Sequence, residues 1–164
     1  MVSRNGHESS VPLMIIAMKG SSSSKKTEIA TKLAAFLRYP LIDEGDVISA
    51  LESSDPPIFP STEDDYKDLP FEIVSDISST QLRLKLNVIM NSELSQRTHF
   101  EHLVQMASSK GASLLIVDCE VQNGGALYDV GDVPKLSIDI TKPFVVEEFV
   151  PAILRAVGFP QGNT

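Results

Sequence analysis

Residues 13–27 decide the fold, and they read Leu13-Met14-Ile15-Ile16-Ala17-Met18-Lys19-Gly20-Ser21-Ser22-Ser23-Ser24-Lys25-Lys26-Thr27. The apolar run 13–18 predicts a buried strand, and apolar residues at helical spacing predict an amphipathic helix over 26–37. A strand, a loop of small residues and a helix in this order direct backbone N–H groups and a helix N-terminus at an anion. The stretch therefore predicts a phosphate-binding loop.

The loop departs at one position from the pattern G-x-x-x-x-G-K-[ST], because Lys25 occupies the place of the second glycine. The candidate phosphate-binding residues are Gly20, Ser21, Ser22, Ser23, Ser24, Lys25, Lys26 and Thr27. We expect the N–H groups of residues 22–27 to converge on one oxyanion. A basic, serine-rich linker before a helix is the alternative interpretation of the same residues.

Size and charge restrict the class of protein. A chain of 164 residues with 42% hydrophobic content suits a single domain, which we place at 12–158 between a disordered tail (1–11) and a C-terminal tail (159–164). The net charge of −8 argues against nucleic acid and anionic membranes as partners. No apolar secretory signal or membrane span is visible, so a cytoplasmic location is the default expectation. The single cysteine, Cys119, is expected to be buried at the end of a strand.

Four further strands are predicted at 40–43, 87–91, 113–118 and 135–139. Helices are expected between them: one capped by Asp46, one after Pro70, one capped by Ser95 and ended by Gly111, and one over 146–157. The helix after Pro70 is expected to have Ile73, Ile77 and Leu84 on one face, with Phe71 and Val74 beside them. Pro151 predicts a kink or a late start in the last helix. Strands that alternate with helices indicate an α/β fold with a parallel sheet covered on both faces.

Several stretches resemble P-loop small-molecule kinases of the zeta-toxin and adenylyl-sulfate kinase type, and in particular a group of plant proteins described only as P-loop NTPase-superfamily members. They are residues 18–27, 40–47, 79–82, 91–97 and 128–136. The resemblance extends from about Leu13 to Val157. It implies a three-layer P-loop NTPase fold with five parallel strands in the order 2-3-1-4-5. It also implies ATP or another nucleoside triphosphate with Mg²⁺ as cofactors.

The resemblance assigns a role to four positions. Lys26 matches the phosphate-loop lysine, and Thr27 matches the hydroxyl that binds Mg²⁺. Asp43 matches the first acid of an Asp-x-Asp pair, whose second acid takes the proton of the acceptor. Asn91 stands where relatives use an aspartate to hold Mg²⁺ through water.

The chain departs from the family at three other places. Lys25 replaces a glycine whose backbone conformation few side chains adopt, so we expect strain of ~1–3 kcal/mol there. Gly45 replaces the second acid, and Asp46 follows one residue late as a candidate base or helix cap. Residues 120–134 hold no lysine or arginine, although relatives place a basic lid there. A genuine deletion and a shortened isoform would both give this sequence.

These departures favour a degenerate P-loop kinase-like protein that binds nucleotide weakly or not at all and transfers phosphate poorly or not at all. Such a protein would serve as an interaction or regulatory module, and a protein partner is left open. The alternative is an active kinase of a small-molecule acceptor that uses Lys26, Asp43 and Asp46 as catalytic residues, with Thr27 and Asn91 at the metal.

Three weaker candidates stay open. The apolar strand that ends at Asp118 and Glu120 also resembles the metal-and-water site of a simple NTP hydrolase. Arg97 could reach an anionic acceptor or lie on the surface. His99 and His102 have a spacing that permits metal binding, but a solvated helix face is the favoured interpretation.

Overall fold

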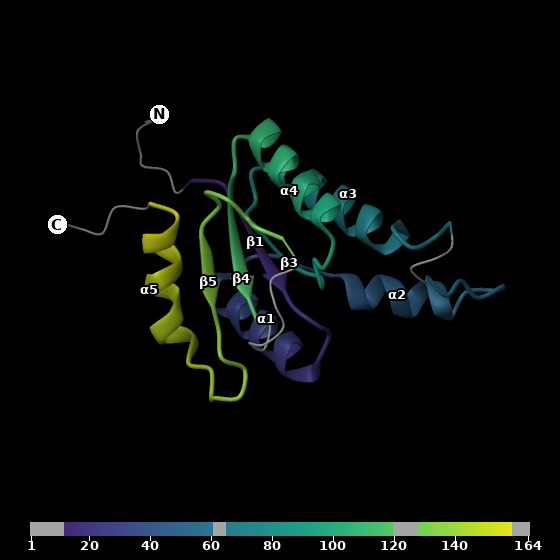
Figure 1. Ribbon diagram of the computed structural model, residues 1–164, viewed down its shortest axis with the longest axis horizontal. Helices are drawn as coiled ribbons and strands as arrows, with labels where there is room; N and C mark the ends of the chain where they lie inside the picture. Colours follow the sequence, from purple (N-terminus) through teal and green to yellow (C-terminus); the bar gives the residue numbers. More distant parts are fainter. Residues whose placement is uncertain (1–11, 61–64, 120–127, 159–164) are drawn as a thin grey trace, which may run out of the picture.

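A five-stranded parallel sheet forms the centre of the structure, a computed structural model that describes residues 12–60, 65–119 and 128–158 (Figure 1). The strands are β1 (Met14–Lys19), β2 (Leu41–Asp43), β3 (Val88–Asn91), β4 (Ser113–Asp118) and β5 (Lys135–Ser137). Their order is β2-β3-β1-β4-β5, and every neighbouring pair is parallel. The expected fold class and strand order are confirmed.

The helices are α1 (Ser24–Leu37), α2 (Glu44–Glu52), α3 (Leu69–Arg83), α4 (Arg97–Lys110) and α5 (Val146–Ala156). The side chains of β1 alternate between the two faces of the sheet. Ile15 and Ala17 pack in the cluster that includes α3 and α4, whereas Met14, Ile16 and Met18 pack with α1 and α5. The sheet is thus covered on both faces, as expected (Figure 1).

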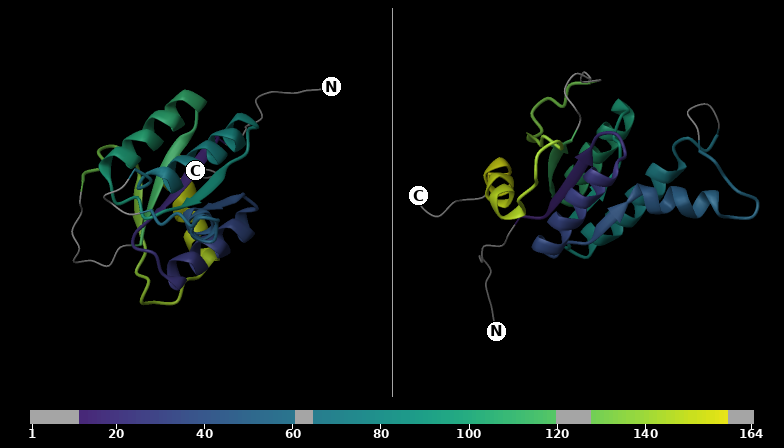
Figure 2. Two further views of the ribbon diagram at one scale, coloured as in Figure 1. Left: turned by 90° about the vertical axis from the view of Figure 1, so that its right-hand side faces the viewer. Right: turned by 90° about the horizontal axis from the view of Figure 1, so that it is seen from below.

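Helix α2 lies beyond the β2 edge of the sheet and runs beside α3 (Figure 2). All of its residues retain some exposure, so α2 adds little to the core. Because α2 follows β2 without an intervening loop residue, its N-terminus stands directly at the carboxyl end of the sheet. In an open parallel sheet, this is the edge where ligands bind.

Local predictions about the helices need correction. Asp46 is not the cap of α2, because Asp43 takes that position and its carboxylate accepts from the N–H of Gly45 at 2.8 Å. Ser95 is not the cap of α4, since α4 begins one residue later behind Gln96, which makes no side-chain cap bond. Gly111 does end α4, with a left-handed φ of 68°.

The buried face of α3 was predicted in part. Phe71 and Val74 are buried, as expected. Ile77 and Leu84 are exposed instead of buried. The buried stripe also includes Ser75 and Ser78, which a pattern based on hydrophobicity misses. The last helix begins at Val146 with Pro151 inside it, so it has no late start.

Cys119 is 3% exposed at the end of β4, as expected. Strand β5 ends at Ser137, two residues earlier than expected. The predicted tails lie outside the described residues, and the single domain over 12–158 stays a prediction.

Candidate active site

The loop between β1 and α1 leaves the strand at Gly20. Its φ of 137° lies in a region that favours glycine, so the position needs this residue type. The N–H of Gly20 donates to the carbonyl of Glu93 at 3.1 Å, which holds the start of the loop against the segment that follows β3. Gly20 therefore forms the expected turn.

The N-terminus of α1 is capped by Ser23. The Ser23 hydroxyl accepts from the N–H of Lys26, and its carbonyl accepts from the N–H of Thr27, both at 3.1 Å. These two N–H groups bind within the helix, so the expected convergence of all N–H groups from 22 to 27 on one oxyanion is wrong. The N–H groups of Ser24 and Lys25, in the first turn, have no partner within an α-helix. No acidic side chain occupies that turn, and its dipole favours an anion.

Lys25 does not strain the loop. It lies within α1, and the described non-glycine residues with positive φ are Arg38, Lys85 and Leu94. The expected strain at Lys25 is therefore wrong. Its ammonium lies 3.9 Å from the Glu28 carboxylate on the same helix, and it is not among the residues that line the cleft described below.

The Lys26 side chain is 2% exposed and reaches across the sheet edge, where its Nζ donates to the carbonyl of Ser92 at 2.6 Å. Burial lowers the pKa of the Lys26 ammonium below its usual value of 10.5, and the nearby Cys119, Glu93, Asp43 and Glu44 raise it in part. A buried ammonium that donates a hydrogen bond to a neutral carbonyl gains stability from a nearby anion.

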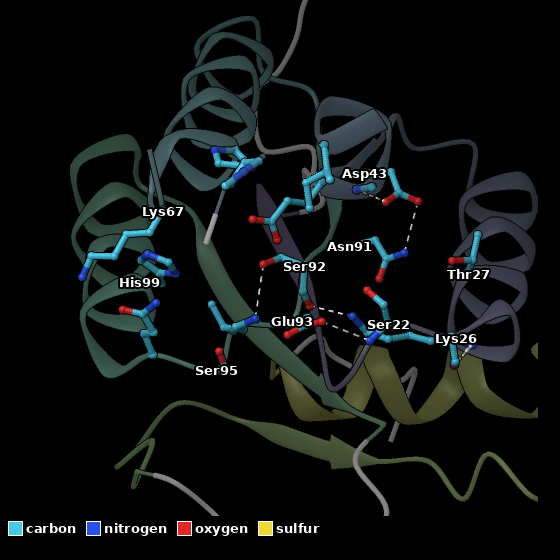
Figure 3. A pocket seen from close by; sticks show the side chains of 18 of the residues that line it. Ser22, Lys26, Thr27, Asp43, Lys67, Asn91, Ser92, Glu93, Ser95 and His99 are labelled. Atoms are coloured by element: carbon cyan, nitrogen blue, oxygen red, sulfur yellow. Dashed lines mark hydrogen bonds between the residues drawn. The ribbon is translucent and has the colours of Figure 1, made fainter. Parts of the chain in front are cut away.

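A cleft of about 670 Å³ opens at this edge of the sheet (Figure 3). Loop and α1 residues form one wall, the β2–α2 junction forms the second, and the segment after β3 forms the third. Its lining residues are Ser22, Ser23, Ser24, Lys26, Thr27, Asp43, Glu44, Gly45, Ile48, Pro60, Lys67, Pro70, Asn91, Ser92, Glu93, Leu94, Ser95, Gln96 and His99.

Asp43 and Asn91 lie side by side because β2 and β3 pair them in register. The Asn91 amide donates through Nδ2 to Asp43 Oδ2 at 3.2 Å, while Asp43 Oδ1 caps α2 (Figure 3). Asn91 is 6% exposed, and its Oδ1 has no hydrogen-bond partner among the described residues. In Figure 3 the labelled Asn91 side chain points between Asp43 and the Lys26–Ser92 contact. The cleft thus offers a buried oxygen acceptor to a donor or a hydrated cation.

Two carboxylates of the cleft were missed by the sequence analysis. Glu44 receives hydrogen bonds from the Ser92 side chain and the Glu93 backbone, and burial raises the pKa of its carboxyl above the usual 4.5. Glu93 Oε2 accepts from the N–H of Ser22 at 3.4 Å. Their positions gave a signal, because Glu44 follows Asp43 directly and Glu93 lies two residues beyond the end of β3.

Other candidates lie elsewhere. Ser21 and Asp46 are exposed, and neither they nor Gly20 line the cleft. Arg97 lines a separate cavity on the outer side of α4 and pairs with Glu101 at 2.9 Å, so it does not reach this cleft. Asp118 is also absent from the lining, its carboxylate lies 3.8 Å from Lys135 Nζ, and Glu120 lies outside the described residues.

The two histidines have different environments. His99 lines the cleft, and Asp68 Oδ1 accepts a hydrogen bond from its Nε2 at 2.9 Å. The His99 ring stacks on Phe71 with ring centroids 4.0 Å apart. The solvated face expected for it is therefore wrong, whereas His102 is exposed. Among residues 12–60, 65–119 and 128–158, no group of three or more His, Cys, Asp or Glu side chains could hold a metal ion.

The region expected to lack a basic lid lies mostly at 120–127, outside the described residues. The chain resumes at Tyr128, whose hydroxyl donates to the carbonyl of Leu94 at 2.6 Å and whose ring packs on Phe100. Within the part of the chain that the structure describes, no helix has the length and apolar character needed to span a membrane.

Comparison with solved structures decides the fold. The Mycobacterium tuberculosis APS kinase, solved in complex with AMPPNP and APS, matches 88% of this chain and 97% of its own, with a TM-score of 0.63 and 11% identity. A gluconokinase from Sinorhizobium meliloti matches with a TM-score of 0.58 and 18% identity, over 89% of this chain and 91% of its own. A shikimate kinase from Aquifex aeolicus matches with a TM-score of 0.54 and 18% identity, over 88% of this chain and 95% of its own.

The chain has the fold of the P-loop kinases. No protein-family model matches the sequence, and neither does any curated protein. At these identities the P-loop kinase similarity extends to the fold, and the roles of the cleft residues stay predictions.

Proposed function

We propose that this P-loop kinase-like protein binds ATP or another nucleoside triphosphate weakly in the cleft and transfers its phosphate poorly or not at all. The observation that carries the binding claim is Lys26, a buried cation at the first turn of α1 that lines the cleft. A triphosphate placed there would gain its charge, together with the N–H groups of Ser24 and Lys25 and the positive end of the helix.

Mg²⁺ fits the residues present. Thr27 lines the cleft at the end of α1 that carries Lys26, and the Asn91 Oδ1 is a buried acceptor without a partner among the described residues. These two side chains would hold the ion, Thr27 directly and Asn91 through water. The ion supplies charge neutralisation of the phosphates when it is bound. Since Asn91 contributes no negative charge, we expect weak metal affinity.

Charge is the reason to expect poor transfer. The carboxylates of Asp43, Glu44 and Glu93 line the cleft, while the lysines on its lining are Lys26 and the exposed Lys67. Phosphoryl transfer depends on cations that neutralise charge on the phosphates, and sequence 120–134 supplies none.

The cleft also lacks a well-placed general base for the proton of the acceptor. Both oxygens of Asp43 already accept hydrogen bonds, Gly45 has no side chain to offer, and Asp46 lies outside the cleft. A missing general base lowers a rate by about 10²–10⁴. A kinase fold with these losses is suited to regulation by nucleotide binding or to recognition of a protein partner.

The second candidate is an active kinase of a small molecule. The composition of the cleft lining favours it, because Lys67, Gln96 and His99 offer polar groups to an acceptor. Simple NTP hydrolysis through Asp118 is disfavoured, since Asp118 does not line the cleft.

Calorimetric titration with ATP, with and without Mg²⁺, tests the proposal. Lys26→Ala should weaken ATP binding about 10- to 100-fold, because a charged hydrogen bond to phosphate is lost. Lys32→Ala is the matched control, since this exposed lysine of the same helix pairs with Glu28 and lies away from the cleft. Equal affinity of wild type and Lys26→Ala would exclude the proposed site. Transfer to a metabolite panel at about 1 s⁻¹ or faster would show an active kinase instead.

A further inference from the structure

The segment that follows β3 places a carboxylate inside the phosphate-binding loop. Glu93 Oε2 accepts from the N–H of Ser22 at 3.4 Å, and Glu93 is one of the negative charges that act on the Lys26 ammonium. An N–H group of the loop and the loop's lysine are the groups that a phosphate would use. Figure 3 shows the Glu93 carboxylate facing Ser22, with a dashed line for this hydrogen bond.

The backbone below Glu93 is held firmly. Its carbonyl accepts from the N–H of Gly20 at 3.1 Å, and its backbone bonds to Glu44. The next residue, Leu94, is 1% exposed with a φ of 51°, a left-handed conformation that is unusual for a bulky side chain. Tyr128 anchors that residue through the Leu94 carbonyl at 2.6 Å. Strained conformations persist where the surroundings determine them, so the fold directs Glu93 to the loop.

The Glu93 carboxylate itself is held only weakly at the loop. Glu93 is an exposed residue, and 3.4 Å is long for a hydrogen bond between N–H and a carboxylate. Departure of the carboxylate would uncover both the Ser22 N–H and the charge of Lys26.

We infer that Glu93 is a specificity-determining residue: its carboxylate acts as an internal anion that competes with phosphate for the loop. This inference rests on the proposed function, because it concerns the same site. It attributes the proposed weak binding of nucleotide to competition by Glu93 instead of to a damaged loop. The ligands disfavoured most are those of high negative charge, such as free polyphosphates without a metal ion.

The test uses inorganic tripolyphosphate and ATP, without Mg²⁺, as probes on the full chain. Glu93→Gln removes one charge and keeps the shape, and it should bind tripolyphosphate about tenfold more tightly than wild type. Glu101→Gln is the matched control, because it removes the same charge from the exposed pair with Arg97 outside the cleft. Its affinity should stay within about twofold of wild type, since distant exposed charges are screened.

Two further measurements separate competition from a structural effect. The Ser22 amide resonance in a ¹⁵N–¹H spectrum should shift in Glu93→Gln and move further when tripolyphosphate is added. In the double variant Lys26→Ala with Glu93→Gln, most of the gain should vanish, because the freed charge belongs to Lys26.

Unchanged or weaker tripolyphosphate binding by Glu93→Gln would overturn the inference, and so would an equal gain in Glu101→Gln. Its failure differs from that of the proposed function, which fails when Lys26→Ala leaves ATP affinity unchanged. Tripolyphosphate binding by Glu93→Gln alone, without measurable binding by wild type, would support the inference and show that competition is complete.

Discussion

Two helix N-termini border the cleft, and they treat negative charge in opposite ways. Helix α1 is capped by a neutral serine, Ser23, and its first turn carries lysines and no acid. Helix α2 is capped by the carboxylate of Asp43 and carries Glu44 and Asp46 in its first turn. An N-terminus attracts anions, so α2 supplies its own and α1 depends on an anion from elsewhere. The difference distinguishes the α1 wall of the cleft, where we propose that phosphate binds, from the α2 wall.

Removal of the two caps should break this comparison most strongly. Asp43→Ala loses the cap of α2 and the bond from Asn91, and we expect it to lower the free energy of unfolding by about 2 kcal/mol. Ser23→Ala loses a single cap bond and should cost about 1 kcal/mol. Urea unfolding measures both. The control Asp46→Ala should stay within about 0.5 kcal/mol, since its side chain is exposed. A larger loss for Asp46→Ala than for Asp43→Ala would contradict the assigned cap.

Lys26→Met sharpens the α1 side. Methionine is similar in length to the lysine side chain and removes a buried charge. We therefore expect the free energy of unfolding to rise by about 1 kcal/mol at neutral pH, together with loss of nucleotide binding. Because burial lowers the folded-state pKa of Lys26, the unfolded state binds more protons between that pKa and 10.5. Wild-type stability therefore rises with pH in this window, and the difference in free energy of unfolding between Lys26→Met and wild type should shrink. A difference that grows with pH would refute the lowered pKa.

Glu44→Gln probes the α2 side through pH. Burial raises the folded-state pKa of Glu44, so its contribution to stability is present below about pH 4.5 and is lost as the pH rises through the folded pKa. Stability of wild type relative to Glu44→Gln should therefore fall across this range. Urea unfolding at a series of pH values measures it, and a constant difference between the two proteins would show that the carboxyl titrates normally.

Arg97→Ala should have the smallest effect. The N-terminus of α4 has no side-chain cap bond, and its Arg97 pairs with Glu101 on the exposed surface. We expect a change below about 0.5 kcal/mol in unfolding and no change in ATP affinity. A clear loss of ATP affinity would mean that Arg97 reaches the cleft in the bound state.

The sequence predicted the inner strands of the sheet well because they are apolar and buried. The runs that became β1 and β4 are continuous in Ile, Leu, Val and Met, and both lie in the centre of the sheet. The strand order came from the resemblance, since periodicity does not determine how parallel strands are arranged. Lys26, Thr27, Asp43 and Asn91 line one cleft, and their roles there stay predictions.

Predictions failed where the tertiary context overrides local pattern. The buried face of α3 uses Ser75 and Ser78, which hydrophobicity does not reveal. The expected strain at Lys25 assumed the backbone of a glycine, but here the residue is part of α1. Glu93 was overlooked because its contact with Ser22 spans 71 residues and depends on the turn after β3. Long-range polar contacts of this kind carry no periodic signal in sequence.

The hydrogen bond between Tyr128 and the Leu94 carbonyl has a consequence for local opening. Residues 91–94 are tied at once to the β1–α1 loop through Gly20 and Lys26, to β2 through Asp43, and to the segment that begins at Tyr128. Segments joined in this way open together. The amide protons of Gly20 and Leu94 should therefore exchange with deuterium at a common rate, and Tyr128→Phe should accelerate both.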